Sequence, residues 1–382
     1  MHTKKALMIG AGNIGRGFIG ERLANGGYEI IFADVNMTII NEINRTGSYR
    51  VHIMDTRQDV TEISNISGVS SASPEFIKAF QTCSLITTAV GPAILPRIAP
   101  ALASAIDARR LSGSAEPFNI IACENAIHAS SLLKNAVMEH LNQDGILYLE
   151  QSGGFPNCAV DRIVPPASFD NILDVAVERY FEWDVEKSGF RGEIPEIPGM
   201  TLVDKLDAYL ERKLFTLNAG HAICAYLGYH NGIQTIDAAI ENPEIFNIVS
   251  GAMRESGEAL IRKFSFNPDK HAAYIDAILN RFRNPFLGDD VARVGREPIR
   301  KLSAQDRLIK PLNSAISYNL DHQNIITGIA AALNYDNPDD KQSREMQALL
   351  KQYGVRGTLN RISGLSENSQ VAIRIEEACY AM

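Results

Sequence analysis

The chain has 382 residues, of which 45% are hydrophobic and 21% are charged, and its formal net charge is −8. These values are typical of a globular protein with two or three domains, and they argue against disorder, collagen and coiled coil. The acidic balance and the lack of a concentrated basic run argue against a nucleic-acid partner. No apolar stretch approaches the ~20 residues of a membrane span, and the five cysteines form no C-x-x-C pair. We therefore expect a cytoplasmic protein with no membrane or nucleic-acid partner.

The first half of the chain alternates short apolar runs with helical patterns. Four apolar runs bounded by Gly, Pro, Asn or Asp predict strands over residues 5–9, 29–34, 84–90 and 118–123. The stretches with helical spacing are residues 14–25, 37–44 and 126–141. This repetition of strand and helix predicts an α/β fold with a parallel sheet that has helices on both faces.

The pattern changes twice further along the chain. Over residues 172–185, apolar side chains such as Val175 and Trp183 alternate with acidic ones, which predicts a half-exposed antiparallel strand. After the turn-rich segment 189–199, helical spacing dominates in residues 202–227, 243–264, 271–282, 324–333 and 368–382. We therefore predict two domains, an α/β domain over residues 1–190 and a mostly α-helical domain over residues 191–382.

A glycine-rich turn follows the first predicted strand and precedes a helical run. It reads Gly10-Ala11-Gly12-Asn13-Ile14-Gly15. Glycines at this spacing allow a tight turn, the approach of a pyrophosphate to the backbone, and close packing of helix on strand. The pyrophosphate would lie at the helix N-terminus, where Arg16 would add a positive charge. The pattern therefore predicts a dinucleotide site.

The end of the second predicted strand indicates which dinucleotide is bound. Asp34 stands where an acid holds the ribose hydroxyls of the adenosine, and its charge would repel a 2′-phosphate, which favours NAD over NADP. The segment at the end of the third predicted strand, residues 88–92, is expected to place its backbone next to the cofactor. The expected cofactor-binding residues are Gly10, Gly12, Asn13, Ile14, Gly15, Arg16, Asp34, Val90, Gly91 and Pro92.

An amine, an amide and an imidazole share one sector of a predicted helix in the second half. At ~100° per residue, Asn218 lies about 140° and His221 about 80° from Lys213. Polar groups are costly to bury without partners, so this grouping favours a functional site. The alternatives are that Lys213 is an exposed surface lysine and that His221 is a core histidine.

Four motifs occur in the order seen in the polyol-specific long-chain dehydrogenases, which the sequence resembles over essentially its whole length. They are residues 10–18, Ala122-Cys123-Glu124-Asn125, residues 160–163 and Lys213-x4-Asn218-x2-His221. The resemblance implies a Rossmann-type, doubly wound N-terminal domain and a mostly helical C-terminal domain. It also implies a metal-independent, NAD-linked oxidoreductase that interconverts a polyol phosphate and a ketose phosphate, here D-mannitol 1-phosphate and D-fructose 6-phosphate.

The resemblance also implies roles for five residues of the motifs. Lys213 is the expected general base, which takes the hydroxyl proton when hydride leaves the alcohol carbon. Burial or cationic neighbours such as Arg212 would favour its neutral amine. Asn218 and Asn125 would donate hydrogen bonds to the reacting oxygen. His221 would orient a substrate hydroxyl, and Asp161 would position the sugar chain or Lys213; the alternative is that Asp161 pairs with its neighbour Arg162.

Several cations are candidates for holding the substrate phosphate, since arginine is suited to bidentate phosphate contacts. They are Arg300, Lys301, Arg307 and Lys310. A solvated charged surface is the alternative for each of them. His128 stands where we expect relatives often to carry an arginine, which leaves the substrate contacts on that side undefined.

Other classes of protein are weaker matches to the sequence. There is no H-E-x-x-H motif and no cysteine pair with ligand spacing, so no metal site is expected. Two alternatives remain: a related dehydrogenase acting on an unphosphorylated polyol or a sugar acid, and a non-catalytic NAD-binding sensor.

Overall fold

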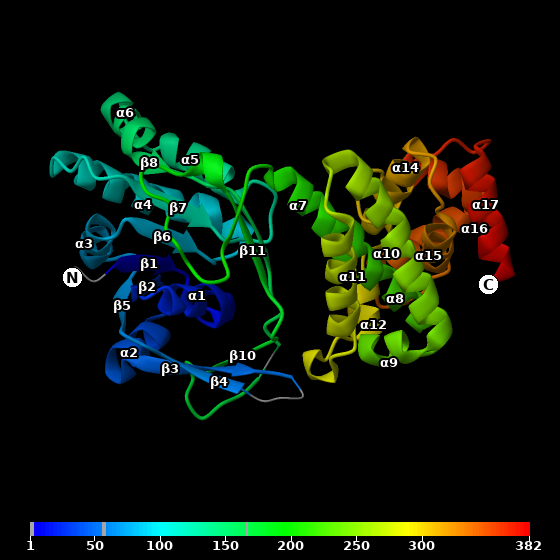
Figure 1. Cartoon of the computed structure of the whole chain (residues 1–382), viewed down its shortest axis with the longest axis horizontal. Coiled ribbons are helices and arrows are strands. Elements are labelled where there is room, and N and C mark those ends of the chain that lie inside the picture. The colour runs from blue at the N-terminus through cyan, green and yellow to red at the C-terminus, as the bar shows by residue number, and fades with distance from the viewer. Residues whose placement is uncertain (1–3, 56–58, 166) are drawn as a thin grey trace. The chain divides into compact units, whose positions relative to one another are not determined.

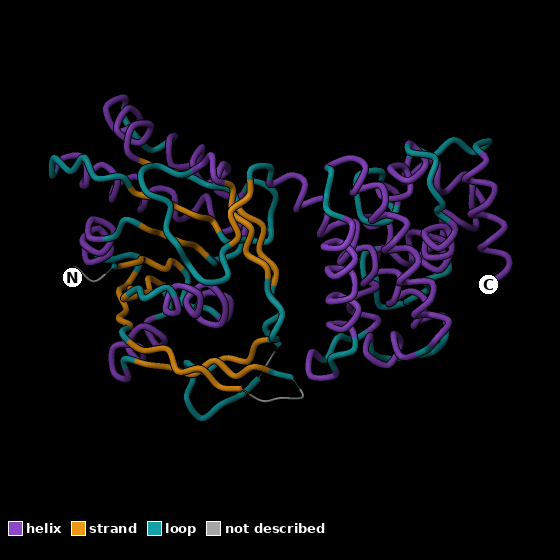
Figure 2. Tube along the Cα trace, viewed as in Figure 1, coloured by secondary structure: helices purple, strands orange, loops and turns teal. Residues whose placement is uncertain are grey.

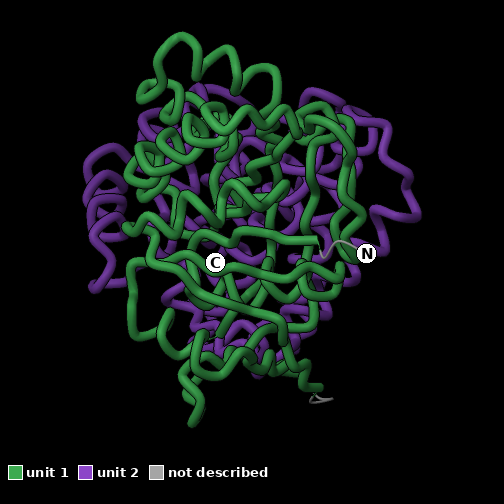
Figure 3. The backbone as a smooth tube through the Cα atoms, turned by 90° about the vertical axis from the view of Figure 1, so that its left-hand side faces the viewer, with its two compact units in different colours: residues 1–206 green, residues 207–382 purple. Residues whose placement is uncertain are grey.

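The computed structural model describes residues 4–55, 59–165 and 167–382. The chain divides into two compact units, residues 1–206 and 207–382 (Figure 3). Every strand that the structure describes lies in the first unit, and the described part of the second unit is helical (Figure 2). None of the described helices is long and apolar enough to cross a membrane.

The first unit is built on a six-stranded sheet (Figure 1). Its strands are β1 (Lys5–Ile9), β2 (Glu29–Asp34), β5 (Ile66–Ser70), β6 (Leu85–Thr88), β7 (Phe118–Ala122) and β8 (Gly153–Gly154). They are ordered β5-β2-β1-β6-β7-β8, and every neighbouring pair is parallel. This is the order of a doubly wound nucleotide-binding sheet, with its switch point between β1 and β6. The predicted Rossmann-type fold is confirmed.

Helices cover both faces of this sheet, and successive residues of a strand enter different cores. In β1, Ala6 and Met8 belong to one buried cluster, and Leu7 and Ile9 belong to the other. Burial on both faces explains why these strands read as continuous apolar runs. The helical segments of this unit are η1 (a π-helical turn, Gly15–Gly20), α1 (Glu21–Asn25), α2 (Met37–Thr46), α3 (Pro74–Thr82), η2 (Pro92–Ile94), α4 (Leu95–Leu111), α5 (Ala129–Met138), α6 (Gln143–Ser152) and η3 (Lys187–Gly189).

Two smaller sheets complete the first unit. One has the order β10-β3-β4 and contains β3 (Ser48–Ile53), β4 (Asp59–Ser64) and β10 (Val175–Val177). The other has the order β12-β11-β9 and contains β9 (Cys158–Asp161), β11 (Glu182–Glu186) and β12 (Thr201–Val203). Because β12 pairs with β11, the first unit extends beyond residue 190, where the sequence placed the boundary.

The prediction of a single half-exposed antiparallel strand over residues 172–185 is wrong. The structure has two strands there: β10 pairs parallel with β3, and β11 pairs antiparallel with β9. Glu178 lies between them, is buried, and accepts a hydrogen bond from Ile163 N. Asp184, expected on the solvent side, is buried as well. The acids on the polar side of the alternation are therefore not all exposed.

The second unit is a helical bundle. Its segments are η4 (a π-helical turn, Leu214–Asn218), α8 (Ala219–His230), α9 (Ile236–Glu241), α10 (Pro243–Phe264), α11 (Pro268–Phe282), η5 (Pro285–Leu287), α12 (Val291–Gly295), α13 (Pro298–Lys301), α14 (Ile309–Ser317), α15 (Gln323–Leu333), α16 (Lys341–Ser363) and α17 (Gln370–Ala381); α7 (Leu206–Lys213) leads into it. Helix α8 is buried along most of its length and packs against α9, α10, α12 and α15. An apolar helix of this kind belongs inside a bundle.

Local signals explain why some of these helices were predicted closely. Helix α10 begins with Pro243, and the Asn242 side chain caps it by accepting from Glu244 N and Ile245 N at 2.9 and 3.3 Å. Ser265 ends it in the left-handed conformation. The predicted bounds 243–264 are confirmed.

Candidate functional site

The glycine-rich turn lies at the switch point of the six-stranded sheet, where β1 ends. Gly10 has φ 100°, and a Cβ at this residue would collide with Ala89 O. A Cβ on Gly15 would collide with Gly10 O, whereas a Cβ on Gly12 would meet no atom within 4 Å. The turn is therefore packed tightly at Gly10 and Gly15 and open at Gly12, as expected of backbone that a diphosphate approaches. Asn13 and Ile14 are exposed at the start of the helix that follows.

Asp34 joins the turn to the end of β2. Its Oδ2 accepts a hydrogen bond from Ala11 N at 2.7 Å, and its Oδ1 accepts one from Asn36 N at 2.9 Å. The carboxylate is only partly buried, so it keeps acceptor capacity toward solvent. A carboxylate fixed beside the glycine turn fits the ribose hydroxyls of an adenine dinucleotide.

Arg16 braces the turn from inside the protein. The residue is 3% exposed, and its guanidinium donates to Ala11 O, to Leu173 O at 2.9 Å and to Asn13 Oδ1 at 3.4 Å. Its hydrogen bonds therefore go to the protein, and it fixes the conformation of the turn. The contact with Leu173 could not be predicted from the sequence, because it joins segments far apart in the chain.

The second predicted cofactor segment lies directly across the switch point. Val90 and Gly91 follow β6, and Pro92 begins η2. A Cβ on Gly10 would lie 3.0 Å from Val90 Cγ1, so this segment packs against the glycine turn. Asn125 is exposed just beyond β7 and follows Glu124, a buried residue of the same motif for which the sequence predicted no role.

Arg162 lies beneath the helix that follows the glycine turn. Its guanidinium forms a buried ion pair with Glu21 and donates to Gly17 O at 3.1 Å and Glu178 O at 3.0 Å. Arg162 therefore has partners other than its neighbour Asp161. Asp161 ends β9 and is partly buried.

In the second unit, Lys213, Asn218 and His221 follow one another along a continuous helical run formed by α7, η4 and α8. The predicted angles are wrong, because they assume uniform α-helix. Ala219 N bonds to Leu214 O, five residues back, so one turn of this run is π-helical. A wider turn brings residues five apart, such as Lys213 and Asn218, nearly above one another. Single π turns inside α-helices are frequent at functional sites.

His221 is held by partners on either side of its ring. Its Nε2 lies 3.0 Å from Asp289 Oδ2, and its ring stacks on Phe282 with centroids 5.1 Å apart. Burial lowers the pKa of His221, and the Asp289 carboxylate opposes that shift. The imidazole is therefore neutral near pH 7. An ionised carboxylate at this distance favours the tautomer with the proton on Nε2, in which Nδ1 is the acceptor nitrogen.

A cavity of about 570 Å³ within the second unit has His221 in its wall. Six of its lining residues are basic: Arg293, Arg296, Arg300, Lys301, Arg307 and Lys341. Three are acidic: Glu297, Asp339 and Asp340. The excess of cations makes the cavity suitable for an anionic ligand. Lys310 lies outside this set, in the first turn of α14.

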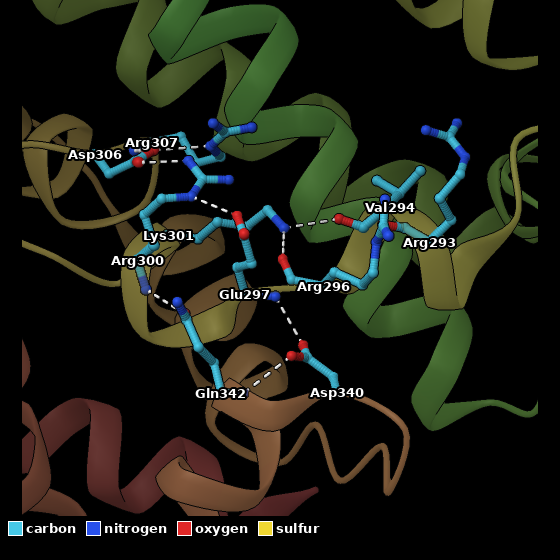
Figure 4. A network of polar contacts seen from close by, with 10 residues as sticks. All are labelled: Arg293, Val294, Arg296, Glu297, Arg300, Lys301, Asp306, Arg307, Asp340 and Gln342. Carbon is cyan, nitrogen blue, oxygen red and sulfur yellow. Dashed lines mark hydrogen bonds and ion pairs between the residues drawn. The ribbon is translucent and has the colours of Figure 1, made fainter. Parts of the chain in front are cut away.

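Carboxylates hold two of these arginines in place (Figure 4). Arg300 Nη1 donates to Asp306 Oδ2 at 3.0 Å, and Arg307 Nε donates to Asp306 Oδ1 at 2.8 Å. Arg300 Nε also donates to Glu297 Oε2 at 2.7 Å. Although burial opposes it, Arg307 lowers the pKa of Asp306, which keeps this bridge charged. Each guanidinium retains further N–H groups for a ligand.

Lys301 is the most buried cation of the cavity, at 5% exposure. Its ammonium donates to Val294 O at 2.9 Å and to Arg296 O (Figure 4). Burial, together with repulsion from Arg307 and Arg300, lowers the pKa of Lys301 to about 7. An anion in the cavity would favour the protonated form.

No group of three or more His, Cys, Asp or Glu side chains suited to a metal ion occurs among the described residues.

Comparison with known proteins supplies the family. A family model described as the mannitol dehydrogenase Rossmann domain matches residues 4–199, and one described as the mannitol dehydrogenase C-terminal domain matches residues 205–382. A D-sorbitol dehydrogenase in substrate-free form aligns with a TM-score of 0.85 at 18% identity, covering 99% of this chain and 93% of that one. The mannitol 2-dehydrogenase of Pseudomonas fluorescens, in a ternary complex with NAD and D-mannitol, aligns with a TM-score of 0.72 at 16% identity, covering 99% and 91%. At these identities the two structures demonstrate a shared fold.

Proposed function

The chain belongs to the mannitol dehydrogenase family, and we propose that it interconverts D-mannitol 1-phosphate and D-fructose 6-phosphate with NAD as the cofactor, as a mannitol-1-phosphate 5-dehydrogenase does. The observation that carries the phosphorylated substrate is the cation-rich cavity of the second unit. It combines His221, a residue of the Lys213-x4-Asn218-x2-His221 motif, with Arg300, Lys301 and Arg307.

The first unit binds the cofactor in this proposal. The turn that is open at Gly12 receives the pyrophosphate, and Asp34 accepts hydrogen bonds from the adenosine ribose. Bound NAD supplies the hydride acceptor for oxidation of the alcohol carbon. Arg16 and Arg162 keep the turn and its helix in shape through their hydrogen bonds to carbonyl groups.

The residues of the motifs supply the acid–base chemistry in this proposal; Lys213, Asn218 and His221 belong to the second unit, and Asn125 and Asp161 belong to the first. Lys213 Nζ takes the hydroxyl proton as the alcohol carbon loses hydride, and returns a proton to the oxygen in the reverse direction. Asn218, with Asn125, donates hydrogen bonds to the oxygen as negative charge develops on it. His221 accepts a hydrogen bond from a substrate hydroxyl at Nδ1, and Asp161 positions the sugar chain.

The phosphate is bound through charge and geometry. Asp306 holds Arg300 and Arg307 in fixed orientations, so their remaining N–H groups are preorganised for phosphate oxygens. Lys301 adds a charge that the dianion itself stabilises. A neutral polyol has no phosphate group to bind these cations, so it would not use the positive charge of the cavity.

Oxidation of NADH, followed by absorbance, tests this proposal. We expect kcat/KM for D-fructose 6-phosphate to exceed that for D-fructose by about three orders of magnitude, since a bound phosphate contributes several kcal/mol. Faster turnover of the free ketose would instead support a dehydrogenase of unphosphorylated polyols. Tight NADH binding without turnover of either sugar would support the non-catalytic sensor.

A further inference from the structure

Glu124 uses both of its carboxylate oxygens to hold the turn that follows β6. Its Oε1 accepts hydrogen bonds from Thr88 Oγ1 at 2.7 Å and from Val90 N at 2.9 Å. Its Oε2 accepts one from Gly91 N at 2.9 Å. Glu124 is 5% exposed and Thr88 is fully buried, so the bond between them is shielded from water, and the two backbone bonds are partly buried.

The position of Glu124 follows from the sheet. Strands β6 and β7 are parallel neighbours, and Cys123 N extends their ladder by donating to Thr88 O at 3.0 Å. The chain after β7 therefore runs beside the chain after β6. Backbone N–H groups just beyond a strand have lost their ladder partners and need others when they are buried. Glu124 accepts from two consecutive groups of this kind.

The chemistry requires a carboxylate and not an amide. A buried carboxylate is stable only when several donors surround it, and three do so here. A glutamine has a single acceptor oxygen, and its NH₂ group would point at a backbone N–H. Replacement of Glu124 by glutamine keeps the shape of the side chain but places its NH₂ group against a backbone N–H group, so that two donors face each other.

The turn that Glu124 holds is itself part of the cofactor site. Ala89 N donates a hydrogen bond to Ile9 O at 2.9 Å. A Cβ added to Gly10 would collide with Ala89 O, so Ala89 packs directly against the glycine turn. A shift of Val90 or Gly91 would therefore be transmitted to Gly10. The same carboxylate also fixes the segment that leads directly into Asn125.

We propose that Glu124 is a positioning residue for the nucleotide: its carboxylate sets the conformation of residues 89–92 and so the shape of the site at the switch point. The inference rests on the proposed NAD-dependent function. Glu124 acts through the backbone of Val90 and Gly91, and so its loss weakens nucleotide binding while leaving the second unit unchanged.

Equilibrium binding of NADH to the full-length protein, followed by fluorescence, provides the first test. We expect Glu124→Gln to raise the Kd for NADH about tenfold or more, as befits lost charge-assisted hydrogen bonds. The matched control is Glu255→Gln, because Glu255 also accepts from two consecutive backbone groups, Asn324 N at 2.9 Å and Ile325 N at 3.0 Å, but in the second unit. That control should bind NADH within about twofold of wild type.

Hydrogen–deuterium exchange of the nucleotide-free protein gives a readout independent of activity. Amides of residues 86–94 should exchange faster in Glu124→Gln than in wild type, and those of residues 5–15 should follow. If Glu124→Gln does not fold, Thr88→Val removes one donor and keeps both backbone bonds. This variant should raise the Kd for NADH about threefold.

The inference is overturned if Glu124→Gln, or Thr88→Val when the first variant does not fold, binds NADH within about twofold of wild type. It is also overturned if Glu255→Gln weakens NADH binding equally, because the effect would then be general destabilisation. Failure of the proposed function is distinguishable, since wild type would then bind no NADH or would bind it without reducing the ketose phosphate.

Discussion

His221 Nε2 lies 3.0 Å from Asp289 Oδ2, and Asp289 also pairs with Arg293 in the wall of the cation-rich cavity. One carboxylate therefore links His221, a histidine of the proposed catalytic motif, to a cation of the cavity. Burial opposes the shift, but His221 and Arg293 lower the pKa of Asp289, which keeps it ionised. An ionised Asp289 favours the tautomer of His221 with Nε2 protonated, and in our proposal Nδ1 then accepts a substrate hydrogen bond.

Removal of the Asp289 charge should impair the use of the sugar substrate. We expect Asp289→Asn to lower kcat/KM for D-fructose 6-phosphate about 10- to 100-fold, because the orientation and tautomer of His221 are no longer fixed. The Kd for NADH should be unchanged. The neighbouring Asp290, which caps α12 by accepting from Arg293 N at 2.8 Å, provides the control Asp290→Asn. Equal effects of the two substitutions would contradict the role of Asp289.

Lys213→Ala should remove the general base. We expect kcat to fall about 10³-fold while the Kd for NADH stays within about twofold, since acid–base catalysis contributes roughly 10²- to 10⁴-fold. Lys263→Ala is a suitable control, because Lys263 binds Glu211 at 2.8 Å on the surface of the same unit. A kcat within about threefold of wild type would exclude Lys213 as the base.

Substrate affinity should depend on the protonation of Lys301, whose pKa is lowered to about 7 by burial and by the charges of Arg307 and Arg300. As pH rises through 7 the ammonium loses its proton, so the KM for D-fructose 6-phosphate should rise between pH 6.5 and 8.5. Because the second pKa of the phosphate is about 6, the phosphate is mostly dianionic only above about pH 7, so the rise in KM above pH 7 reports Lys301. In Lys301→Met this part of the pH dependence should disappear.

Calorimetry in buffers of different ionisation enthalpy measures the same linkage directly. Binding of the sugar phosphate at pH 7.5 should take up a fraction of a proton in wild type and none in Lys301→Met. Lys310→Met, outside the residues that line the cavity, should behave as wild type. Proton uptake that persists in Lys301→Met would show that another group titrates.

His271 should make the second unit sensitive to acid. It is 4% exposed and stacks on Phe266, and burial, assisted by Arg212, lowers the pKa of His271 to about 4. Because the unfolded histidine has the higher pKa, the unfolded state binds more protons below pH 6.5, and stability falls as pH decreases. Between pH 7 and 5 the loss from this group is roughly 2 kcal/mol.

Urea unfolding at several pH values tests this effect. His271→Leu should reduce the slope of unfolding free energy against pH in this range, whatever its effect at pH 7. The interval stays above the titration of most carboxylates, which isolates the histidine contribution. An unchanged slope would indicate that burial does not lower the pKa of His271 in the native state.

The sequence predicts best the elements whose pattern is local. β1 and β2 are predicted at their observed bounds, because burial on both faces makes each an uninterrupted apolar run between turn residues. α10 carries its own start and stop signals in Asn242, Pro243 and Ser265. The glycine turn and Asp34 form a recognisable pair for the same reason, since a fixed spacing joins them.

Features that depend on distant partners could not be predicted in this way. The π turn at residues 214–218 breaks the assumed helical period, and no apolar pattern marks such an insertion. A lone glutamate gives no sign that it will accept hydrogen bonds from Val90 N and Gly91 N. The interruption at Glu178 likewise depends on a bond to Ile163 N. Each arises from tertiary packing that overrides the local pattern.

The most direct test of the central claim is to follow the hydride itself. NADH carrying deuterium at carbon 4 on the transferred face is incubated with D-fructose 6-phosphate and, in a parallel reaction, with free D-fructose, and each product is examined by NMR. We predict mannitol 1-phosphate with its phosphate retained and deuterium on carbon 5, the former carbonyl carbon of the ketose. No deuterium in a phosphorylated product, with label appearing only in mannitol formed from free fructose, would contradict the account.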